Sequence, residues 1–127
     1  MHTFTFNHLA LSVKDVDKSV EFYQKVFQFR EIRNTASSSR TRWLSIGGGR
    51  QLHLIPRPEL EVKTNKAVHF ALSTPDFDSF VSQIIKLNIP YSDWRDTPDK
   101  RYIRGDGIRQ IYFQDIDGYW IEVNNDC

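Results

Sequence analysis

The chain has 127 residues, of which 39% are hydrophobic and 26% are charged, and these proportions suit one compact domain. Seventeen basic against sixteen acidic residues leave a formal net charge of +1, which argues against a nucleic-acid-binding protein, because such proteins usually carry a basic stripe. No apolar run approaches the roughly 18 residues of a membrane span, and Cys127 is the only cysteine, so we expect no membrane segment, no intrachain disulfide and a cytoplasmic location.

The first half of the chain predicts a strand, a helix and three further strands. The stretch NHLALSVKD, residues 7–15, reads as a strand with one histidine, His8, at its centre. Apolar residues at helical spacing then predict an amphipathic helix. These residues are Val16, Val20, Tyr23 and Phe27. Period-two alternation predicts the three strands that follow, near 30–36, 40–46 and 50–56.

The second half repeats this pattern. The stretch VHFALSTPD, residues 68–76, matches residues 7–15 and places His69 where the first copy has His8. A second helical pattern follows, formed by Phe77, Val81, Ile84 and Leu87. Three strands are predicted after it, near 91–95, 108–114 and 119–124. We therefore expect one domain of two modules, about 1–57 and 66–127, with a polar linker at 58–65, because a half of this size is marginal alone.

Polar residues in both copies predict where the helices begin. Ser12-x-x-Asp15 and Ser73-x-x-Asp76 have the spacing of a capping box, in which the serine is the N-cap and the acidic residue lies three positions later. In the second copy Thr74 is another candidate N-cap, because Pro75 after it suits the first position of a helix.

Strand alternation predicts that four potential metal ligands point away from the helices. Apolar neighbours such as Leu52 and Leu54 should face the helix, so the residue between them should face the other way. The four residues sorted in this manner are His8, His53, His69 and Glu122. Each of them alone needs only a hydrogen-bond partner, but a matched set of imidazoles and a carboxylate is what a divalent metal binds.

The repeated segments NHLALSV and AVHFALS and the ending RQIYFQDIDGYWIEV resemble the vicinal oxygen chelate superfamily. This is the glyoxalase, bleomycin resistance protein and dioxygenase-like group, and the resemblance covers nearly the whole chain. It implies an α+β fold in which two tandem βαβββ modules form curved mixed sheets around a metal cleft. It also implies a small-molecule substrate and a homodimer.

The resemblance implies a ligand set and a reaction. The family's ligand positions fall on His8, His69 and Glu122, and the fourth position holds His53, where glyoxalase I usually has a glutamate. One divalent ion of Zn, Ni, Co, Mn or Fe is expected. In a glyoxalase-like lyase or isomerase, with glutathione as a co-substrate, the metal polarises neighbouring substrate oxygens and Glu122 moves a proton. His53 is then a fourth ligand or a second base.

Two other functions remain open at the level of the sequence. His8, His69 and Glu122 also suit an Fe(II)-dependent extradiol-type dioxygenase, in which His53 and Tyr112 would assist proton transfer. Metal-free drug-binding resistance proteins share the resemblance as well, although they typically lack the ligand set.

Basic and aromatic residues are candidates for substrate binding. Arg42 lies beside Arg40 in the first module, and Arg104 lies in a second basic cluster. The other members of that cluster are Lys100, Arg101 and Arg109. Arginine suits carboxylate or phosphate recognition, although exposed arginines usually need no such role. Trp120 shares the strand face of Glu122 and is expected to line the substrate pocket.

Overall fold

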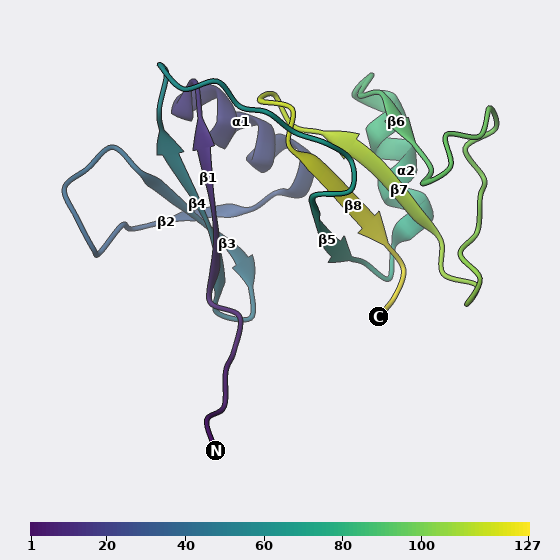
Figure 1. Ribbon diagram of the computed structural model, residues 1–127, viewed down its shortest axis with the longest axis horizontal. Coiled ribbons are helices and arrows are strands. Elements are labelled where there is room, and N and C mark those ends of the chain that lie inside the picture. The colour runs from purple at the N-terminus through teal and green to yellow at the C-terminus, as the bar shows by residue number, and fades with distance from the viewer. The chain divides into compact units, whose positions relative to one another are not determined.

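The computed structural model describes all 127 residues, which form two compact units, residues 1–62 and 63–127. Each unit contains one four-stranded mixed sheet and one helix, in the order strand, helix and three strands (Figure 1). The α+β class and the two βαβββ repeats predicted from the sequence are therefore confirmed. Neither helix has the length and apolar character that a membrane crossing requires.

The sheet of the first unit has the strand order β1-β4-β3-β2. The elements are β1 (His8–Val13), α1 (Val16–Phe27), β2 (Arg30–Ile32), β3 (Arg42–Gly47) and β4 (Arg50–Pro56). β1 pairs with β4 in parallel, and the other two pairs are antiparallel. Val20 and Tyr23 of α1 are buried against one face of the sheet, together with Leu44, Leu52 and Leu54. This apolar layer is the core of the first unit, because all five side chains are almost completely removed from water.

The sheet of the second unit repeats this arrangement with the order β5-β8-β7-β6. The elements are β5 (His69–Ser73), α2 (Phe77–Lys86), β6 (Tyr91–Ser92), β7 (Gln110–Gln114) and β8 (Trp120–Asn124). β5 and β8 are parallel. Ile84 of α2 is buried with Phe113 and Ile121, and the ring of Phe80 lies 6.1 Å from that of Phe113. These contacts define the face of the sheet that α2 covers.

Two strands are shorter than the sequence predicts, and in both cases a side chain turns the backbone away from the sheet. β2 ends at Ile32, after which the Asn34 carboxamide oxygen accepts the backbone N–H groups of Ala36 and Ser37. β6 ends at Ser92, and the fully buried Asp93 then binds backbone groups of the loop that follows. Local side-chain hydrogen bonds of this kind compete with strand pairing.

The predicted capping boxes are wrong by one turn. Ser12 lies in β1, and Asp15 itself is the N-cap of α1, where its carboxylate accepts the N–H of Lys18 at 3.1 Å. The N-cap of α2 is Asp76, whose side chain makes no capping bond, while its N–H donates to the Thr74 hydroxyl. An aspartate is as good an N-cap as a serine, so the spacing alone could not choose between the two.

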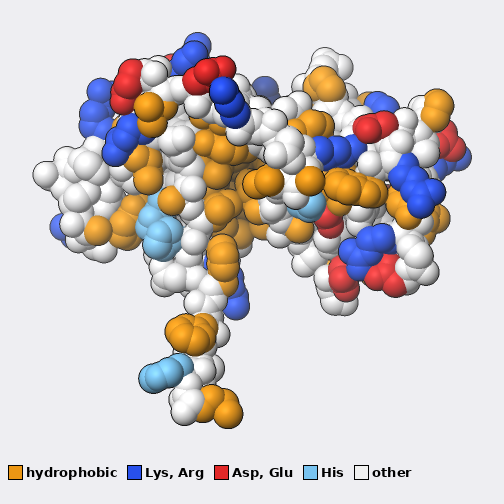
Figure 2. All heavy atoms as spheres, in the orientation of Figure 1, with side chains coloured by type: hydrophobic (Ala, Val, Ile, Leu, Met, Phe, Trp, Pro, Cys, Tyr) orange, Lys and Arg blue, Asp and Glu red, His pale blue; other side chains and the backbone are white.

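Strand pairing divides each sheet into a helix face and an opposite side, which we call the distal face. In the first sheet His53 pairs with Trp43 and Ala10, and these residues lie on the distal face. In the second sheet Tyr112 pairs with Glu122, which in turn pairs with Ala71. The distal positions agree with those expected from strand alternation. Figure 2 shows charged side chains gathered over the region of α1 and, in further groups, over the second unit.

Candidate functional site

A buried carboxylate lies beside an imidazole on the distal face of the second sheet. Glu122 is central in β8 and only 6% exposed, and His69 begins the neighbouring strand β5. The Nε2 atom of His69 lies 3.2 Å from Oε1 of Glu122. A buried carboxylate is costly unless hydrogen bonds or a cation compensate for the lost water, so its surroundings decide what it can do.

Both carboxylate oxygens of Glu122 accept hydrogen bonds, one from the neighbouring strand β7 and one from β8 itself. The Tyr112 hydroxyl donates to Oε1 at 2.5 Å, and Nδ2 of Asn124 donates to Oε2 at 2.6 Å. Nε2 of Gln110 donates to the Tyr112 oxygen at 2.7 Å and so extends the network along β7. These buried donors fix the position of the carboxylate and satisfy part of its hydrogen-bonding capacity.

The phenol of Tyr112 is held in its protonated form. Burial raises the pKa of Tyr112, and the hydrogen bond to Glu122 and the negative charge of Glu122 raise it further. An ionised phenolate beside the carboxylate would place two negative charges together in a buried site. Tyr112 therefore acts as a hydrogen-bond donor to Glu122 and not as a base.

A backbone carbonyl determines how the His69 ring is presented. Nδ1 of His69 lies 2.9 Å from the carbonyl oxygen of Lys66, which can only accept a hydrogen bond, so Nδ1 carries a proton. In the neutral imidazole the lone pair is then on Nε2, the atom that faces Glu122. This type of carbonyl contact is the usual support for a histidine that binds a metal through its other nitrogen.

Aromatic rings and one lysine border this carboxylate and imidazole. The Lys66 ammonium donates to Ser92 Oγ at 2.9 Å and to the carbonyl oxygen of Asp93 at 2.7 Å. It also lies over three rings, at 5.1 to 5.7 Å from their centroids. The rings are those of Trp94, Tyr112 and Trp120. They form an apolar wall beside His69 on which a small substrate can pack.

The first unit carries a stack of rings on its distal face. The His53 imidazole lies between the Trp43 indole, 4.2 Å away, and the His8 imidazole, 4.1 Å away. Its Nε2 is 2.8 Å from Oε1 of Gln51. Burial lowers the pKa of His53, and the neighbouring His8 lowers it further. This environment favours a neutral His53, which can accept a proton or bind a cation.

The predicted ligands come together as two pairs, one in each unit. His8 contacts His53, and His69 contacts Glu122, whereas no group of three or more His, Cys, Asp or Glu side chains is placed to hold a metal ion. Tyr112 joins the second pair through its hydrogen bond to Glu122.

The three predicted substrate-binding residues lie in different surroundings. Trp120 is on the distal face with Glu122. Arg42 pairs with Leu54 across the strands and so lies on the helix face, where it binds Asp17 at 2.6 Å and Glu31 at 2.7 Å. Arg104 is paired with acidic residues of its own unit, Asp106 and Asp126.

Sequence reasoning did not identify three contributors to this site. Asn124 and Gln110 could have been found, because each is two residues from Glu122 or Tyr112 and must share its strand face. Lys66 gave no such signal, because it lies in a polar segment outside any strand and reaches residues 92–96 only through the folded chain.

Comparisons with known proteins agree on one superfamily. Residues 5–123 match the family described as the Glyoxalase/Bleomycin resistance protein/Dioxygenase superfamily. Glyoxylase I 4 from Arabidopsis thaliana is 28% identical over 98% of this chain and 72% of its own length. Metallothiol transferase FosB from Shouchella clausii is 28% identical over 93% of this chain and 77% of its own length.

The fold has a similar counterpart among solved structures. The fosfomycin resistance protein FosX from Listeria monocytogenes superposes with a TM-score of 0.76 and 25% sequence identity. The superposition covers 99% of this chain and 96% of the FosX chain. The two chains therefore share the fold over essentially their whole length.

Proposed function

The chain belongs to the Glyoxalase/Bleomycin resistance protein/Dioxygenase superfamily, and from that premise we propose that it is a divalent-metal-dependent enzyme of the vicinal oxygen chelate type. Its substrate would be a small molecule with two neighbouring oxygen atoms. The leading reaction is a glyoxalase-like isomerisation, in which a proton moves between adjacent carbons of a glutathione hemithioacetal.

One observation carries the proposal: two groups that accept hydrogen bonds face each other. Nε2 of His69, whose other nitrogen donates to a carbonyl, lies 3.2 Å from a carboxylate oxygen of Glu122. Such a pair is stable only with a positive charge between its atoms, either a proton or a metal ion. Ligands about 2.0–2.1 Å from one ion, at tetrahedral or octahedral angles, are separated by about 2.8–3.4 Å, so the observed spacing fits a metal ion.

We assign the remaining roles from the character of each side chain. His69 and Glu122 are two ligands, and His8, of this chain or of a partner chain, is the proposed third, because it carries an exposed imidazole on the corresponding strand of the first unit. Nitrogen and oxygen donors of this kind suit Zn, Ni, Co, Mn or Fe. His53, with its lowered pKa, is the proposed proton acceptor or fourth ligand.

When bound, the metal ion would polarise the two substrate oxygens and stabilise the negative charge that develops on them. Glu122 is held by Tyr112 and Asn124, so it keeps one orientation throughout the reaction. Trp94 and Trp120 would pack against the substrate and exclude water from it. The proton would be moved by Glu122, which accepts a proton when it is ionised, or by His53, which accepts one when it is neutral.

A second candidate reaction is the transfer of a thiol to fosfomycin. It is favoured by the names of several relatives, which are metallothiol transferases and fosfomycin resistance proteins of 25–28% identity. The same ligands would serve this reaction, so the substrate and not the ligand set distinguishes the two candidates.

The first test is the metal content of untagged protein, measured by elemental mass spectrometry. We expect about one equivalent of a transition metal per site in the wild type and a loss of most of it in His69→Ala and Glu122→Gln. His2→Ala, an exposed histidine near the N-terminus, is the matched control and should retain the metal. Wild-type protein that stays metal-free after incubation with Zn, Ni, Co, Mn and Fe would contradict the proposal.

The loaded protein then separates the two reactions. It is assayed with the hemithioacetal of methylglyoxal and glutathione, and separately with fosfomycin and glutathione. Turnover that requires metal and is lost in Glu122→Gln identifies the substrate class. Light scattering of the same sample tests the homodimer, which we include in the proposal.

A further inference from the structure

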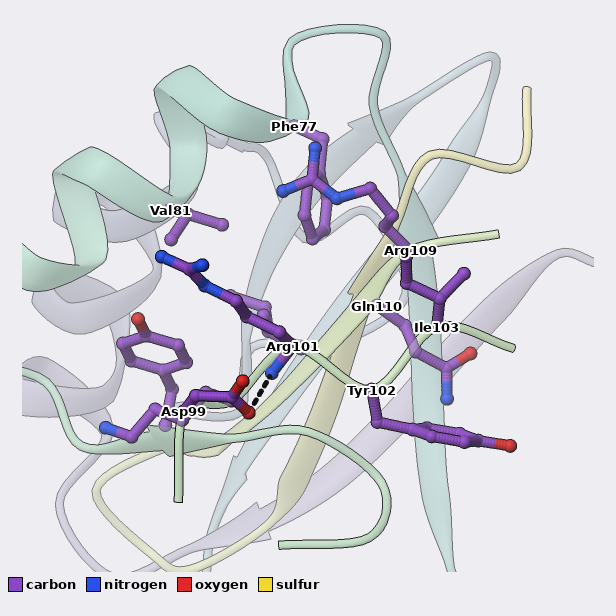
Figure 3. Close-up of a pocket in the computed structure, with 11 residues that line it drawn as sticks. Phe77, Val81, Asp99, Arg101, Tyr102, Ile103, Arg109 and Gln110 are labelled. Atoms are coloured by element: carbon purple, nitrogen blue, oxygen red, sulfur yellow. Dashed lines mark hydrogen bonds between the residues drawn. The ribbon is translucent and has the colours of Figure 1, made fainter. Parts of the chain in front are cut away.

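A cavity of about 440 Å³ lies on the helix face of the second sheet, on the side opposite to His69 and Glu122. It is enclosed by α2, by the strands β6 and β7 and by the loop of residues 99–103 (Figure 3). Sites for small molecules usually measure about 300–1,000 Å³, so the cavity can hold a compact organic ligand.

About half of the wall of this cavity is apolar. Six of its lining side chains are aromatic or aliphatic, and they come from four separate segments of the second unit. They are Phe77, Val81, Tyr91, Tyr102, Ile103 and Ile111. A ligand with an apolar body would remove this surface from water, which stabilises the complex by roughly 25 cal/mol for each Å² buried.

Three cations border the same cavity, against one acidic residue. Lys100, Arg101 and Arg109 line it, and Asp99 is the only carboxylate that does so. Asp99 accepts a hydrogen bond from the backbone N–H of Arg101 and forms no ion pair with Lys100 or with the Arg101 guanidinium, so three cations face one carboxylate. The excess of positive charge at the cavity is therefore a property of the folded loop and not only of its sequence.

Two of these cations have no anionic partner. Arg109 is paired with Asp78 at 2.7 Å, whereas the guanidinium of Arg101 makes no hydrogen bond or ion pair. The Lys100 ammonium lies 4.2 Å from the centre of the Tyr91 ring and has no carboxylate beside it. Figure 3 shows the Arg101 side chain extending from the loop toward Val81, into the cavity. By contrast, Arg42, Lys66 and Arg104 are all paired with acidic residues.

We propose that this cavity is a second small-molecule site, which binds ligands that combine an apolar body with one anionic group. Arg101 and Lys100 would bind the carboxylate, sulfonate or phosphate, and the residues of α2 and β7 would contact the apolar part. None of the proposed metal ligands lines this cavity, because Tyr91 and Ile111 point to the helix face while Tyr112 and Glu122 point to the distal face. Gln110, which donates to Tyr112, is the one lining residue that also belongs to the hydrogen-bond network of Glu122.

Fluorescence titration with 8-anilinonaphthalene-1-sulfonate tests the proposal on the full chain. This probe has an apolar aromatic body and one sulfonate, and N-phenyl-1-naphthylamine supplies almost the same body without the charge. We expect the sulfonate to bind in a salt-dependent manner, with an affinity that does not change when a chelator is added. Amide shifts in NMR spectra should be confined to Val81, Ile103, Ile111 and their neighbours.

Three variants separate this site from general surface binding. Arg101→Gln and Lys100→Gln should each raise the dissociation constant of the sulfonate by about five- to ten-fold, the effect of losing one charge-assisted hydrogen bond at a partly exposed site. Arg40→Gln, an exposed arginine of the first unit, should change it less than two-fold. The neutral probe should bind all four proteins alike.

Three outcomes would overturn the proposal. The first is an unchanged affinity for the sulfonate in both Arg101→Gln and Lys100→Gln. The second is an equal affinity of the wild type for the charged and neutral probes. The third is a set of amide shifts in NMR spectra centred on His69 and Glu122. Because all of these measurements can be made without metal, they succeed or fail independently of the proposed enzyme activity.

Discussion

The imidazole of His53 lies parallel to the indole of Trp43, with ring centroids 4.2 Å apart and an angle of 4° between the planes. Its opposite side is covered by the His8 ring at 4.1 Å. Burial between the two rings lowers the pKa of His53, and the potential charge on His8 acts in the same direction. The first unit thus holds an imidazole that resists protonation.

We expect the lowered pKa of His53 to make the free energy of unfolding depend on pH below about 6.5, the ordinary pKa of histidine. Since the pKa of His53 is lower in the folded chain, the unfolded chain binds more protons as pH falls through this range. The free energy of unfolding should therefore decrease toward acid, and less steeply in His53→Gln. Urea denaturation at about pH 5 and pH 8 measures this difference, with His2→Gln as the control. Equal pH dependence in wild type and His53→Gln would contradict it.

Tyr112→Phe should weaken the second unit and its proposed metal site together. The change removes the donor to Oε1 of Glu122 and the acceptor of the Gln110 amide, both in buried surroundings. We expect a loss of about 1–3 kcal/mol in the free energy of unfolding without metal, and a roughly 10- to 100-fold loss of metal affinity. Urea denaturation and metal titration measure the two effects.

Tyr91→Phe is the matched control for this prediction, because it removes the same atom from the opposite face of the same sheet. It should leave metal affinity unchanged. If Tyr112→Phe bound metal as tightly as Tyr91→Phe, the hydrogen bond to Glu122 would have no part in positioning the ligand.

The sequence was sufficient to predict the repeated modules and the strand faces, because both depend on local patterns. Strand alternation placed Tyr112 and Trp120 on the face of Glu122, and the register agrees. Arg42 shows the limit of composition as a guide. Its charge suggested an anionic substrate, but alternation with the buried Leu44 already places it on the helix face, where Asp17 and Glu31 bind it.

Contacts between distant segments could not be predicted in this way. Lys66 reaches residues 92–96, and Asp93 binds the backbone of Thr97 and Tyr102 in a long loop without regular periodicity. The cavity beside residues 99–103 exists because these contacts fold the loop over α2. Lys66 and Asp93, which hold the loop, are ordinary polar residues in the sequence, and only the folded chain gives them their partners.

Asp93→Asn should loosen this loop. Burial alone would raise the pKa of Asp93, but hydrogen bonds from the Thr97 hydroxyl and from the backbone of Tyr102, Thr97 and Arg95 outweigh it, so the pKa is lowered. The ionised carboxylate thus contributes stability above its ordinary pKa of about 3.8, and this contribution is lost as pH falls below that value.

At neutral pH we expect Asp93→Asn to lose about 1–3 kcal/mol, because an amide cannot accept hydrogen bonds on both sides. Hydrogen exchange should become faster at the amides of Thr97 and Tyr102, which donate to the carboxylate. Asp99→Asn is the control, since Asp99 is exposed. Unchanged exchange at both amides in Asp93→Asn would show that the loop is held by other contacts.

Lys66→Met should separate the two contributions of Lys66 to the site. The ammonium holds Ser92, Asp93 and Asp96, so its loss should cost about 1–3 kcal/mol and shift the indole N–H resonances of Trp94 and Trp120 in NMR spectra. The bond to His69 comes from the backbone carbonyl, which the substitution retains, so metal affinity should fall less than in Tyr112→Phe. Lys63→Met, an exposed lysine nearby, should change neither property. A loss of metal affinity in Lys66→Met as large as that in Tyr112→Phe would mean that the ammonium, and not the carbonyl alone, keeps His69 in place.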